Sequence, residues 1–449
     1  MSQDIRIKKG LDIKLNGEAE KVTKNADSCS VFTLKPEDFH SIIPKLSVKV
    51  GAKLKAGDAV FYNKANEEMK FPSPVSGELV DIIRGEKRKI LEVKIQADPT
   101  QEFADFGIKN PETMNGDEIK AHLLASGCWP FIKQRPYDVV ADAANTPKAI
   151  FVSAYASAPL AADYDYVLAG KEKELQAAVT ALSKLTPGSV HISIGKNSNS
   201  PLTGLNNCTL HKVSGPHPSG NVGTQIAKIN PVNKGETVWT VSPQDLVIIG
   251  ELLVTGKFNA ERTIGLVGSS VEKPMYFTTK IGASVASITK SKLKEGEHRI
   301  ISGNILTGKA QDKKGTLGFY DNLVTVIPEG NDYNLFGWLK PDFNRISSTR
   351  ALTFSWLFPK KKYDLDTNTN GEHRAFVFTG QYENVFPLDI YPLQILKACM
   401  YKDLDEMEAL GMYEVAPEDF ALTEFVCVSK QPHQKIIREG LDLMLKEIG

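Results

Sequence analysis

A short segment, residues 126–138, carries the residue types best suited to binding a flat organic ring. Its sequence SGCWPFIKQRPYD brings three aromatic rings close to two cations, namely Trp129, Phe131, Tyr137, Lys133 and Arg135. Aromatic rings stack on planar ligands and a cation binds carbonyl oxygens, so the segment suits a carbonyl-bearing ring such as a quinone, or a protein interface. We take Trp129, Phe131 and Arg135 as candidate quinone contacts. A hydrophobic wedge between domains is the alternative, and the residue types leave it open.

The loop at residues 215–224, GPHPSGNVGT, is the most unusual in the chain. Its glycines and prolines, together with one histidine, describe a backbone that a ligand can approach closely. The candidate ligand-binding residues are His217, Gly220 and Gly223. A rigid turn at the edge of a sheet explains the same residues, and the combination of glycine with proline favours that alternative.

Other motifs that could do chemistry are incomplete. Residues 303–309, GNILTGK, match GxxxxGK, but Ala310 stands where a serine or threonine must bind magnesium, so we expect a hairpin turn there. No GxGxxG opens a strand–helix unit, and the histidines include no HExxH. The five cysteines are far apart and include no CxxC, so they offer no local ligand set for zinc or an iron–sulfur cluster. We therefore predict no catalytic and no metal-binding residues.

The composition excludes several classes of protein. The chain has 449 residues, enough for about three domains. Lys plus Arg and Asp plus Glu are both 54, and this zero net charge argues against a nucleic-acid partner. Basic clusters at residues 6–9, 84–89 and 360–362 are interpreted as solvated faces, with docking to a partner or an acidic membrane surface as the alternative. No uncharged apolar run approaches the ~20 residues that span a bilayer and no signal peptide opens the chain, so we expect a soluble or peripheral protein.

Residues 48–95 alternate like short strands, with glycine or proline at each corner. The halves VGAKLKAGDAV and PSPVSGELV resemble the two arms of the barrel-sandwich module of biotinyl and lipoyl carriers. A carrier also needs a tight hairpin that presents one lysine. Because Lys70 stands two residues before Pro72, we expect no strand of useful length to return from it. We therefore interpret Lys64 and Lys70 as solvated surface lysines.

After this module the hydrophobic pattern changes. An apolar run at residues 149–154 predicts a buried strand, residues 171–185 predict an amphipathic helix, and residues 190–194 predict the next strand. This strand–helix–strand order implies a Rossmann-like sheet. Residues 262–288 are similar to a soluble-ligand-binding β-grasp repeat, and residues 333–362 are aromatic and basic. The last helix has an apolar stripe of Ile437, Leu441, Met444 and Ile448.

The predicted fold is a multidomain α/β protein with four parts. These are an N-terminal β region with the barrel-sandwich module, a Rossmann-like α/β domain, a β-grasp (SLBB-like) domain and a C-terminal region that is mixed and then helical. The expected boundaries are residues 1–97, 98–256, 257–330 and 331–449.

The order of these modules resembles a family of respiratory proteins, the NqrA subunits of sodium-translocating NADH:quinone oxidoreductases. The complex I NADH-binding flavoprotein and RnfC, from the Rnf complex, are related. The longest stretches that look like the family are NKANEEMKFPSPVSGELVDIIRGEKRK and TNTNGEHRAFVFTGQYENVFPLDIYP, and the shorter ones are KKGLDIKL, GPHPSGNVGT, RIISGN and LFGWLKP. The resemblance covers essentially the whole chain.

The chain departs from its flavin-binding relatives at two places. Those relatives hold FMN on a glycine-rich loop, GxxGRGGAGFP, where this chain has SGCWPFIKQRP, so Trp129, Phe131 and Ile132 occupy the space that glycine leaves open. Their iron–sulfur domain needs CxxCxxC, whereas Cys427 stands alone in FVCVSK, and one thiolate cannot hold a cluster.

The resemblance implies a peripheral subunit without a cofactor of its own, which takes part in quinone binding and is not catalytic by itself. It implies subunits B, C, D, E and F as partners that carry the flavins and iron centres. It also implies a place on the cytoplasmic side of the bacterial inner membrane, attached through those partners. Two alternatives stay open, an FMN-binding NADH dehydrogenase subunit like RnfC and a biotin or lipoyl carrier.

Overall fold

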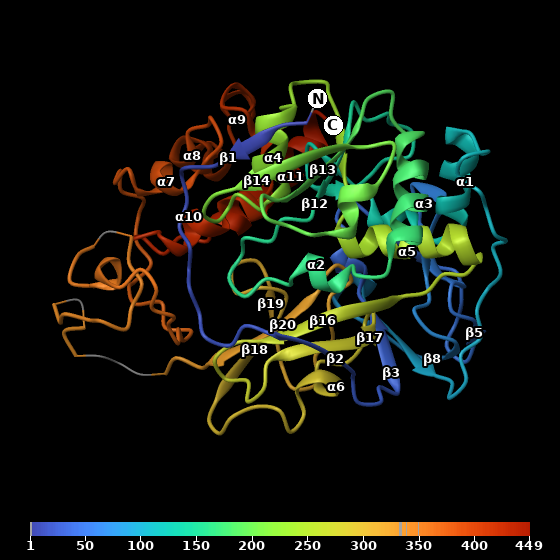
Figure 1. Ribbon diagram of the computed structural model, residues 1–449, viewed down its shortest axis with the longest axis horizontal. Helices are drawn as coiled ribbons and strands as arrows, with labels where there is room; N and C mark the ends of the chain where they lie inside the picture. The colour runs from blue at the N-terminus through green and yellow to red at the C-terminus, as the bar shows by residue number, and fades with distance from the viewer. Residues whose placement is uncertain (1, 332–334, 338, 349) are drawn as a thin grey trace.

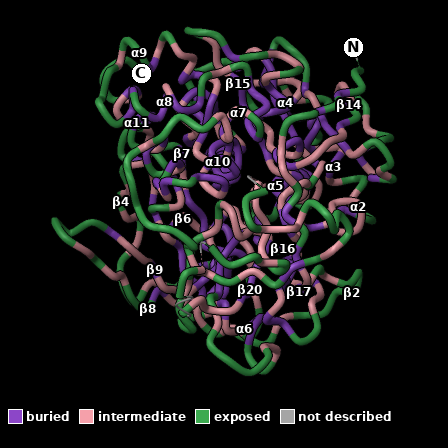
Figure 2. Tube along the Cα trace, turned by 90° about the vertical axis from the view of Figure 1, so that its left-hand side faces the viewer, coloured by how far each residue is buried: buried purple, intermediate pink, exposed green. Residues whose placement is uncertain are grey.

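The protein, described by a computed structural model, folds around four β-sheets flanked by helices (Figure 1). The structure describes residues 2–331, 335–337, 339–348 and 350–449, so Tyr333 and Trp338 of the aromatic and basic stretch lie outside the described residues. Within the described residues the sheets have seven, six, four and three strands. Figure 2 shows the buried segments running through the interior beneath an exposed outer layer.

The barrel-sandwich module consists of the two smaller sheets. One contains β3 (Val31–Leu34), β9 (Ile90–Ala97), β8 (Gly77–Arg84) and β5 (Lys53–Leu54), and the other β4 (Pro44–Leu46), β6 (Ala59–Asn63) and β7 (Asn66–Pro72). The alternation predicted for this module is present, since Val93 and Ile95 of β9 are fully buried while Lys94 between them is not.

The expectation that no hairpin joins the two arms is wrong, because the turn lies at Lys64 and Ala65 and not at Lys70. Strand β7 returns antiparallel to β6, pairing Tyr62 with Lys70 and Phe61 with Phe71, and Lys64 lies exposed in the turn. The strand forms because Pro72 stands at its end, where the missing N–H interrupts no pairing within the strand. The module therefore presents Lys64 at a hairpin turn. Lys64 is exposed, as expected of a surface lysine, whereas Lys70 is partly buried within β7.

The seven-stranded sheet is the predicted Rossmann-like sheet. Its order is β1 (Asp4–Arg6), β14 (Thr209–Ser214), β13 (Val190–Gly195), β12 (Ile150–Ser153), β15 (Val238–Thr240), β10 (Lys133–Arg135) and β11 (Val139–Val140). The first five strands are parallel, and β10 and β11 are added antiparallel at the edge. From β12 the order runs outward to β14 and then returns to β15, so the switch point lies between β12 and β15.

Helices cover both faces of this sheet, which explains why β12 is apolar on both sides. Ile150 and Val152 pack in one core with α3 (Glu172–Ser183) and α5 (Pro243–Thr255). Phe151 packs with Ile226 of α4 (Val222–Ile229) in another. The remaining helices of the domain are α1 (Gly116–Ser126) and the short α2 (Tyr164–Val167). The amphipathic helix predicted at residues 171–185 is confirmed as α3, which buries Leu175, Ala178, Val179 and Leu182 on one face.

The six-stranded sheet belongs to the β-grasp domain. Its order is β19 (Lys309–Gln311), β18 (His298–Ser302), β20 (Leu323–Pro328), β16 (Glu261–Val267), β17 (Met275–Lys280) and β2 (Glu20–Asn25), and the short α6 (Ala286–Thr289) follows β17. Ser302 pairs with Lys309 across the GNILTGK turn, as predicted for a hairpin. Strands β1 and β2 both lie in the N-terminal β region of the predicted division, yet each joins a sheet of a later domain.

The C-terminal region is helical from α7 onward. It contains α7 (Gln381–Val385), α8 (Pro392–Tyr401), α9 (Leu404–Ala409), α10 (Ala421–Phe425) and α11 (His433–Glu447). The predicted stripe of α11 holds for Ile437, Leu441 and Met444, which are fully buried, but Ile448 lies beyond the helix and is exposed. Among the described residues, no helix combines the length and apolar character needed to cross a bilayer.

We expect the close packing of α5 on α3 to depend on Gly250. A Cβ at this position would lie 1.8 Å from the backbone oxygen of Glu174, so Gly250→Ala must push the two helices apart. Overpacking of this kind costs about 1–3 kcal/mol, and it should lower the urea midpoint of unfolding. The matched control is Gly204→Ala, because a Cβ there meets nothing within 4 Å. Equal midpoints for the two variants would contradict the tight helix contact.

Candidate functional site

The crevice at the switch point of the seven-stranded sheet is filled by the glycine–proline loop. Ser153, at the end of β12, donates its hydroxyl to the oxygen of Gly220 at 2.7 Å, and the Gly220 N–H donates to Ser157 Oγ at 2.7 Å. A Cβ on Gly220 would lie 2.3 Å from the oxygen of Tyr155. Open α/β sheets usually bind ligands in this crevice, and here the chain's own backbone occupies it.

His217 fixes the same loop to the N-terminal segment. His217 is 3% exposed. Its backbone N–H donates to Asp12 Oδ1 at 3.0 Å, and its backbone carbonyl oxygen accepts from the backbone N–H of Leu11 at 2.8 Å. Its Nδ1 lies 3.1 Å from Ser157 Oγ. Burial lowers the pKa of His217 to about 4, so the ring is neutral at pH 7. These contacts favour the rigid-turn interpretation of His217 and Gly220, and a ligand role for them stays a prediction.

Arg135 forms a buried ion pair with the C-terminal region. Its guanidinium donates to Asp419 Oδ2 at 2.6 Å and to Glu418 Oε1 at 3.0 Å. The Arg135 side chain is 2% exposed and that of Asp419 is fully buried. A Cβ on Gly223 of α4 would lie 2.4 Å from Asp419 Oδ1, so the bare glycine makes room for the pair.

Arg135 and Gly223 were predicted for two separate sites. In the structure, Gly223 lies directly beside the ion pair that Arg135 forms with Asp419. Sequence reasoning missed Asp419, because nothing in the sequence links two residues 284 positions apart. The only local signal is the acidic pair of Glu418 and Asp419 directly after Pro417.

Trp129 and Phe131 lie in the interior between domains. Trp129 is fully buried, donates its indole N–H to the oxygen of Ala141 at 2.7 Å, and meets Trp239 edge-on at 5.3 Å between ring centroids. Phe131 stacks on Phe319 of the β-grasp domain at 4.9 Å. The geometry favours the wedge between domains that the sequence left open, and quinone contact by Trp129, Phe131 and Arg135 stays a prediction.

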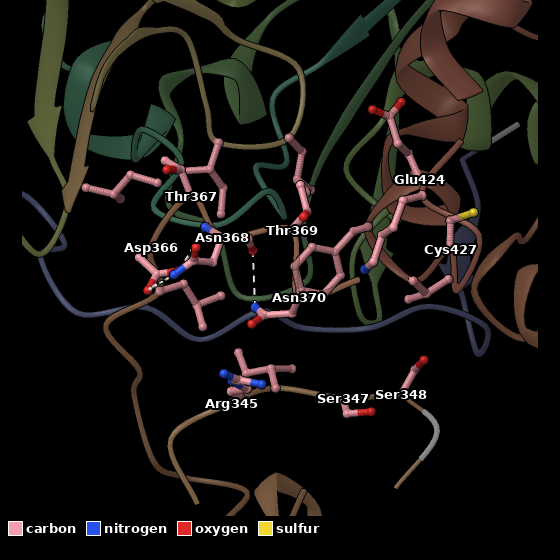
Figure 3. Close-up of a pocket in the computed structure, with 18 of the residues that line it drawn as sticks. Arg345, Ser347, Ser348, Asp366, Thr367, Asn368, Thr369, Asn370, Glu424 and Cys427 are labelled. Atoms are coloured by element: carbon pink, nitrogen blue, oxygen red, sulfur yellow. Dashed lines mark hydrogen bonds between the residues drawn. The ribbon is translucent and has the colours of Figure 1, made fainter. Parts of the chain in front are cut away.

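A large cavity lies elsewhere, between the β-grasp domain, residues 337, 339–348 and 350–370, and the C-terminal helices. Its volume is about 950 Å³. Figure 3 shows Arg345, Ser347 and Ser348 along one wall, residues 366–370 facing them, and Glu424 with Cys427 at the side. Apolar side chains complete the lining, among them Leu15, Ile301, Ile305, Leu306, Leu365 and Phe425. Half of the lining residues are polar or charged, including the carboxylates of Asp342, Asp364, Asp366 and Glu424, so the cavity is more polar than a typical small-molecule site.

Cys427 joins the cavity to a buried polar cluster behind it. Its Sγ lies 3.0 Å from the hydroxyl of Tyr382, whose pKa is raised by burial and by this thiol. The ring of Tyr382 meets that of His433 edge-on, and His433 Nδ1 lies 2.9 Å from Thr423 Oγ1. In the part of the chain that the structure describes, no three His, Cys, Asp or Glu side chains gather in a way that could hold a metal ion.

Comparison with known proteins matches this architecture domain by domain. Family models match residues 5–98 as the NqrA N-terminal barrel-sandwich hybrid domain, 114–258 as the NqrA second alpha/beta domain and 263–313 as the NQRA C-terminal domain. The NqrA protein of the Na⁺-translocating NADH-quinone reductase of Haemophilus influenzae (strain PittGG) is 36% identical over 99% of this chain and 100% of its own length. The chain belongs to the NqrA family.

Two other members of the NqrA family show the same full-length match. The proteins of Neisseria meningitidis (strain Z2491) and Serratia proteamaculans are 36% and 35% identical, each over 99% of this chain and all of their own length. A solved NAD⁺-reducing [NiFe]-hydrogenase in the air-oxidized state shares 11% identity over 49% of this chain and 50% of its own, with a TM-score of 0.34, too low to support an inference.

Membership of the NqrA family confirms the resemblance drawn from the motifs, and the matched domains confirm the predicted fold class. It also confirms that the chain is a subunit of an oxidoreductase complex, which implies other subunits as partners. The site residues Trp129, Phe131, Arg135, His217, Gly220 and Gly223 are not tested by it.

We expect Asp419→Asn to destabilise the chain strongly, because it leaves the Arg135 guanidinium buried without its closest anion. Breaking a buried pair costs about 3–5 kcal/mol, and tryptophan fluorescence in urea should report the lower midpoint. The control is Glu78→Gln, which breaks the exposed pair with Lys53 and should cost less than about 1 kcal/mol. The double variant Arg135→Met with Asp419→Leu should recover much of the stability that Asp419→Asn loses. The role of the pair is contradicted if Asp419→Asn is no less stable than Glu78→Gln and no less stable than the double variant.

His217 should make the fold sensitive to acid. Its pKa is about 4 in the folded chain and near 6.5 when unfolded, so the unfolded state binds the proton more readily. The stabilisation is complete above pH 6.5 and is lost as the pH falls toward 4, by up to about 3 kcal/mol. Urea midpoints measured across this range should therefore fall less steeply in His217→Asn than in the wild type. His373→Gln, at an exposed position, should leave the profile unchanged.

Proposed function

We propose that this chain is the peripheral NqrA component of a Na⁺-translocating NADH:quinone reductase. The whole complex oxidises NADH, reduces quinone and exports Na⁺. The single observation that carries the proposal is the match to relatives from this reductase at 36% identity, with 99% of this chain and their full length aligned. We place the chain on the cytoplasmic side of the bacterial inner membrane, with subunits B, C, D, E and F as partners.

The chain works without a flavin or iron–sulfur cluster of its own, and the partners carry those centres. Two features support this part of the proposal. The loop that holds Gly220 fills the crevice of the seven-stranded sheet, and the side chains of Trp129 and Phe131 fill the interior where flavin-binding relatives have glycines. The alternative, an FMN-binding NADH dehydrogenase subunit, needs an open pocket at one of these two places.

The chain also contributes to quinone binding, and the cavity beside Cys427 is the better location for the ring. Its volume of about 950 Å³ lies in the range of ligand pockets, and its wall combines apolar side chains with the cations Lys430 and Arg345, the latter paired with Asp342 at 2.9 Å. Trp129, Phe131 and Arg135 form a second location, which a quinone reaches only if the wedge between domains opens.

Two variants distinguish these locations. Thr369→Trp adds an indole to the cavity wall at an exposed position, so it should weaken protection by quinone in a photolabelling assay by about tenfold or more. Phe131→Leu keeps the interior apolar and removes the aromatic ring, and it should leave protection unchanged. If Phe131→Leu weakens protection and Thr369→Trp does not, the quinone ring binds at the segment around Phe131. If quinone does not protect even the wild-type chain from labelling, this chain does not bind quinone.

Membership of the complex is tested with the tagged full-length chain expressed in its own host. Purification from membranes followed by mass spectrometry should recover subunits B to F. The same chain, separated from its partners, should be colourless above 350 nm (about the lower limit of flavin absorption), with an intact mass equal to the sequence mass. A yellow chain would support the FMN alternative, and an added mass on Lys64 would support the carrier alternative.

A further inference from the structure

Exposed hydrophobic side chains concentrate in one segment, residues 335–358. Eight of the twenty large hydrophobic residues that are exposed in the described chain lie there, namely Leu335, Phe336, Leu339, Phe343, Leu352, Trp356, Leu357 and Phe358. Trp356 is 48% exposed and Phe358 46%. Soluble surfaces rarely gather such residues without a binding role, so this segment needs a partner.

The same segment is strongly basic. Residues 335–362 contain six cations, Lys340, Arg345, Arg350, Lys360, Lys361 and Lys362, against the single carboxylate of Asp342. Because the whole chain has 54 charges of each sign, the remainder is left with 48 cations and 53 carboxylates. The segment is therefore a positive region on an otherwise slightly acidic molecule.

The aromatic and basic side chains contact one another within this segment. The Arg350 guanidinium lies 5.6 Å from the ring centroid of Trp356, and Phe343 stacks on Phe354 at 4.8 Å. The Lys361 ammonium donates to the oxygen of Phe343 at 2.9 Å. Figure 1 shows this orange segment forming one edge of the molecule, apart from the four sheets. Rings and cations therefore share one surface rather than being scattered.

We propose that the described part of this segment, residues 335–337, 339–348 and 350–362, forms a docking surface for a bilayer of anionic phospholipid. Trp and Phe rings favour the boundary between head groups and acyl chains, and Lys and Arg favour anionic head groups. The acidic remainder of the chain is repelled by the same head groups, so the charges also set the orientation. A protein partner is the alternative occupant, because protein interfaces are also rich in aromatic rings and Arg. The bilayer is favoured because a net positive segment on an otherwise slightly acidic molecule fits anionic head groups.

The docking surface shares Lys340, Arg345 and Leu352 with the lining of the cavity proposed for quinone. Its binding to lipid nevertheless needs neither quinone nor the other subunits, so it can be tested separately from the proposed function. The test is co-sedimentation of the purified full-length chain with vesicles of phosphatidylcholine alone or of phosphatidylcholine with phosphatidylglycerol. The chain should bind the anionic vesicles more tightly, and added salt should weaken that binding. Absence of binding to anionic vesicles, or equal binding to both kinds, would overturn the proposal.

Charge and aromatic variants test the surface itself. Replacing Lys360, Lys361 and Lys362 by Gln should weaken binding to anionic vesicles by about tenfold or more. The matched control replaces Lys87, Arg88 and Lys89 by Gln, since these are three consecutive exposed cations between β8 and β9. This control variant should bind anionic vesicles within roughly twofold of the wild type.

Trp356→Ser with Phe358→Ser should also weaken binding, whereas Tyr391→Ser with Tyr401→Ser, at 65% and 84% exposure on the helical region, should not. Unchanged circular dichroism keeps each comparison valid. Equal losses in the variants and their controls would show non-specific attraction and would overturn the proposal. Binding only to membranes that retain the partner subunits would assign the surface to a protein and overturn it as well.

Discussion

The buried ion pair between Arg135 and Asp419 is the constraint that fixes the position of the C-terminal helical region against the seven-stranded sheet. Arg135 ends β10, the strand next to the edge strand β11, and Asp419 stands just before α10, far along the chain. Neither charge is tolerated in the interior without the other. Gly223 leaves the space that the carboxylate needs, so β10, α4 and the C-terminal region must meet together. Charge pairing, and not apolar burial alone, fixes the helical region against the sheet.

The interior of the α/β domain is filled by its own side chains and loops, including at the switch point. The crevice at the switch point of the seven-stranded sheet is closed by the loop of His217 and Gly220, whose polar groups are satisfied by Ser153 and Ser157. The stack of Phe131 on Phe319 joins the domain to the β-grasp sheet. Space for a ligand is instead found between domains, where the β-grasp strands, residues 337, 339–348 and 350–370, and the C-terminal helices line the cavity.

The N-terminal segment makes the modules inseparable. Strand β1 extends the α/β sheet and β2 extends the β-grasp sheet, before the barrel-sandwich module begins. Between these strands, the Gly17 oxygen accepts from the N–H of Gly268 at 2.9 Å, and a Cβ on Gly17 would lie 2.2 Å from the carbon of Gly268. One short stretch of chain therefore links three domains, so none of them is expected to fold in its present form without the others.

Local patterns in the sequence determined the modules and their order. Alternation predicted the strands of the barrel-sandwich, the apolar run at residues 149–154 predicted a strand buried on both faces, and the stripe of α3 was located correctly, because side-chain periodicity is a local property. Long motifs identified the family. The return of β7 after Lys64 was missed, since a proline at a strand end looks like a break until its partner strand is known.

Only the tertiary structure decided which residues meet. Arg135 finds Asp419 beside Gly223, Trp129 finds Trp239, and the wall of the cavity is gathered from segments hundreds of residues apart. A sequence specifies which side chains are aromatic, charged or small. Contacts between residues far apart in the sequence depend on how the sheets are joined. For this reason the composition of the candidate site could be listed from the sequence, while its burial and its partners could not.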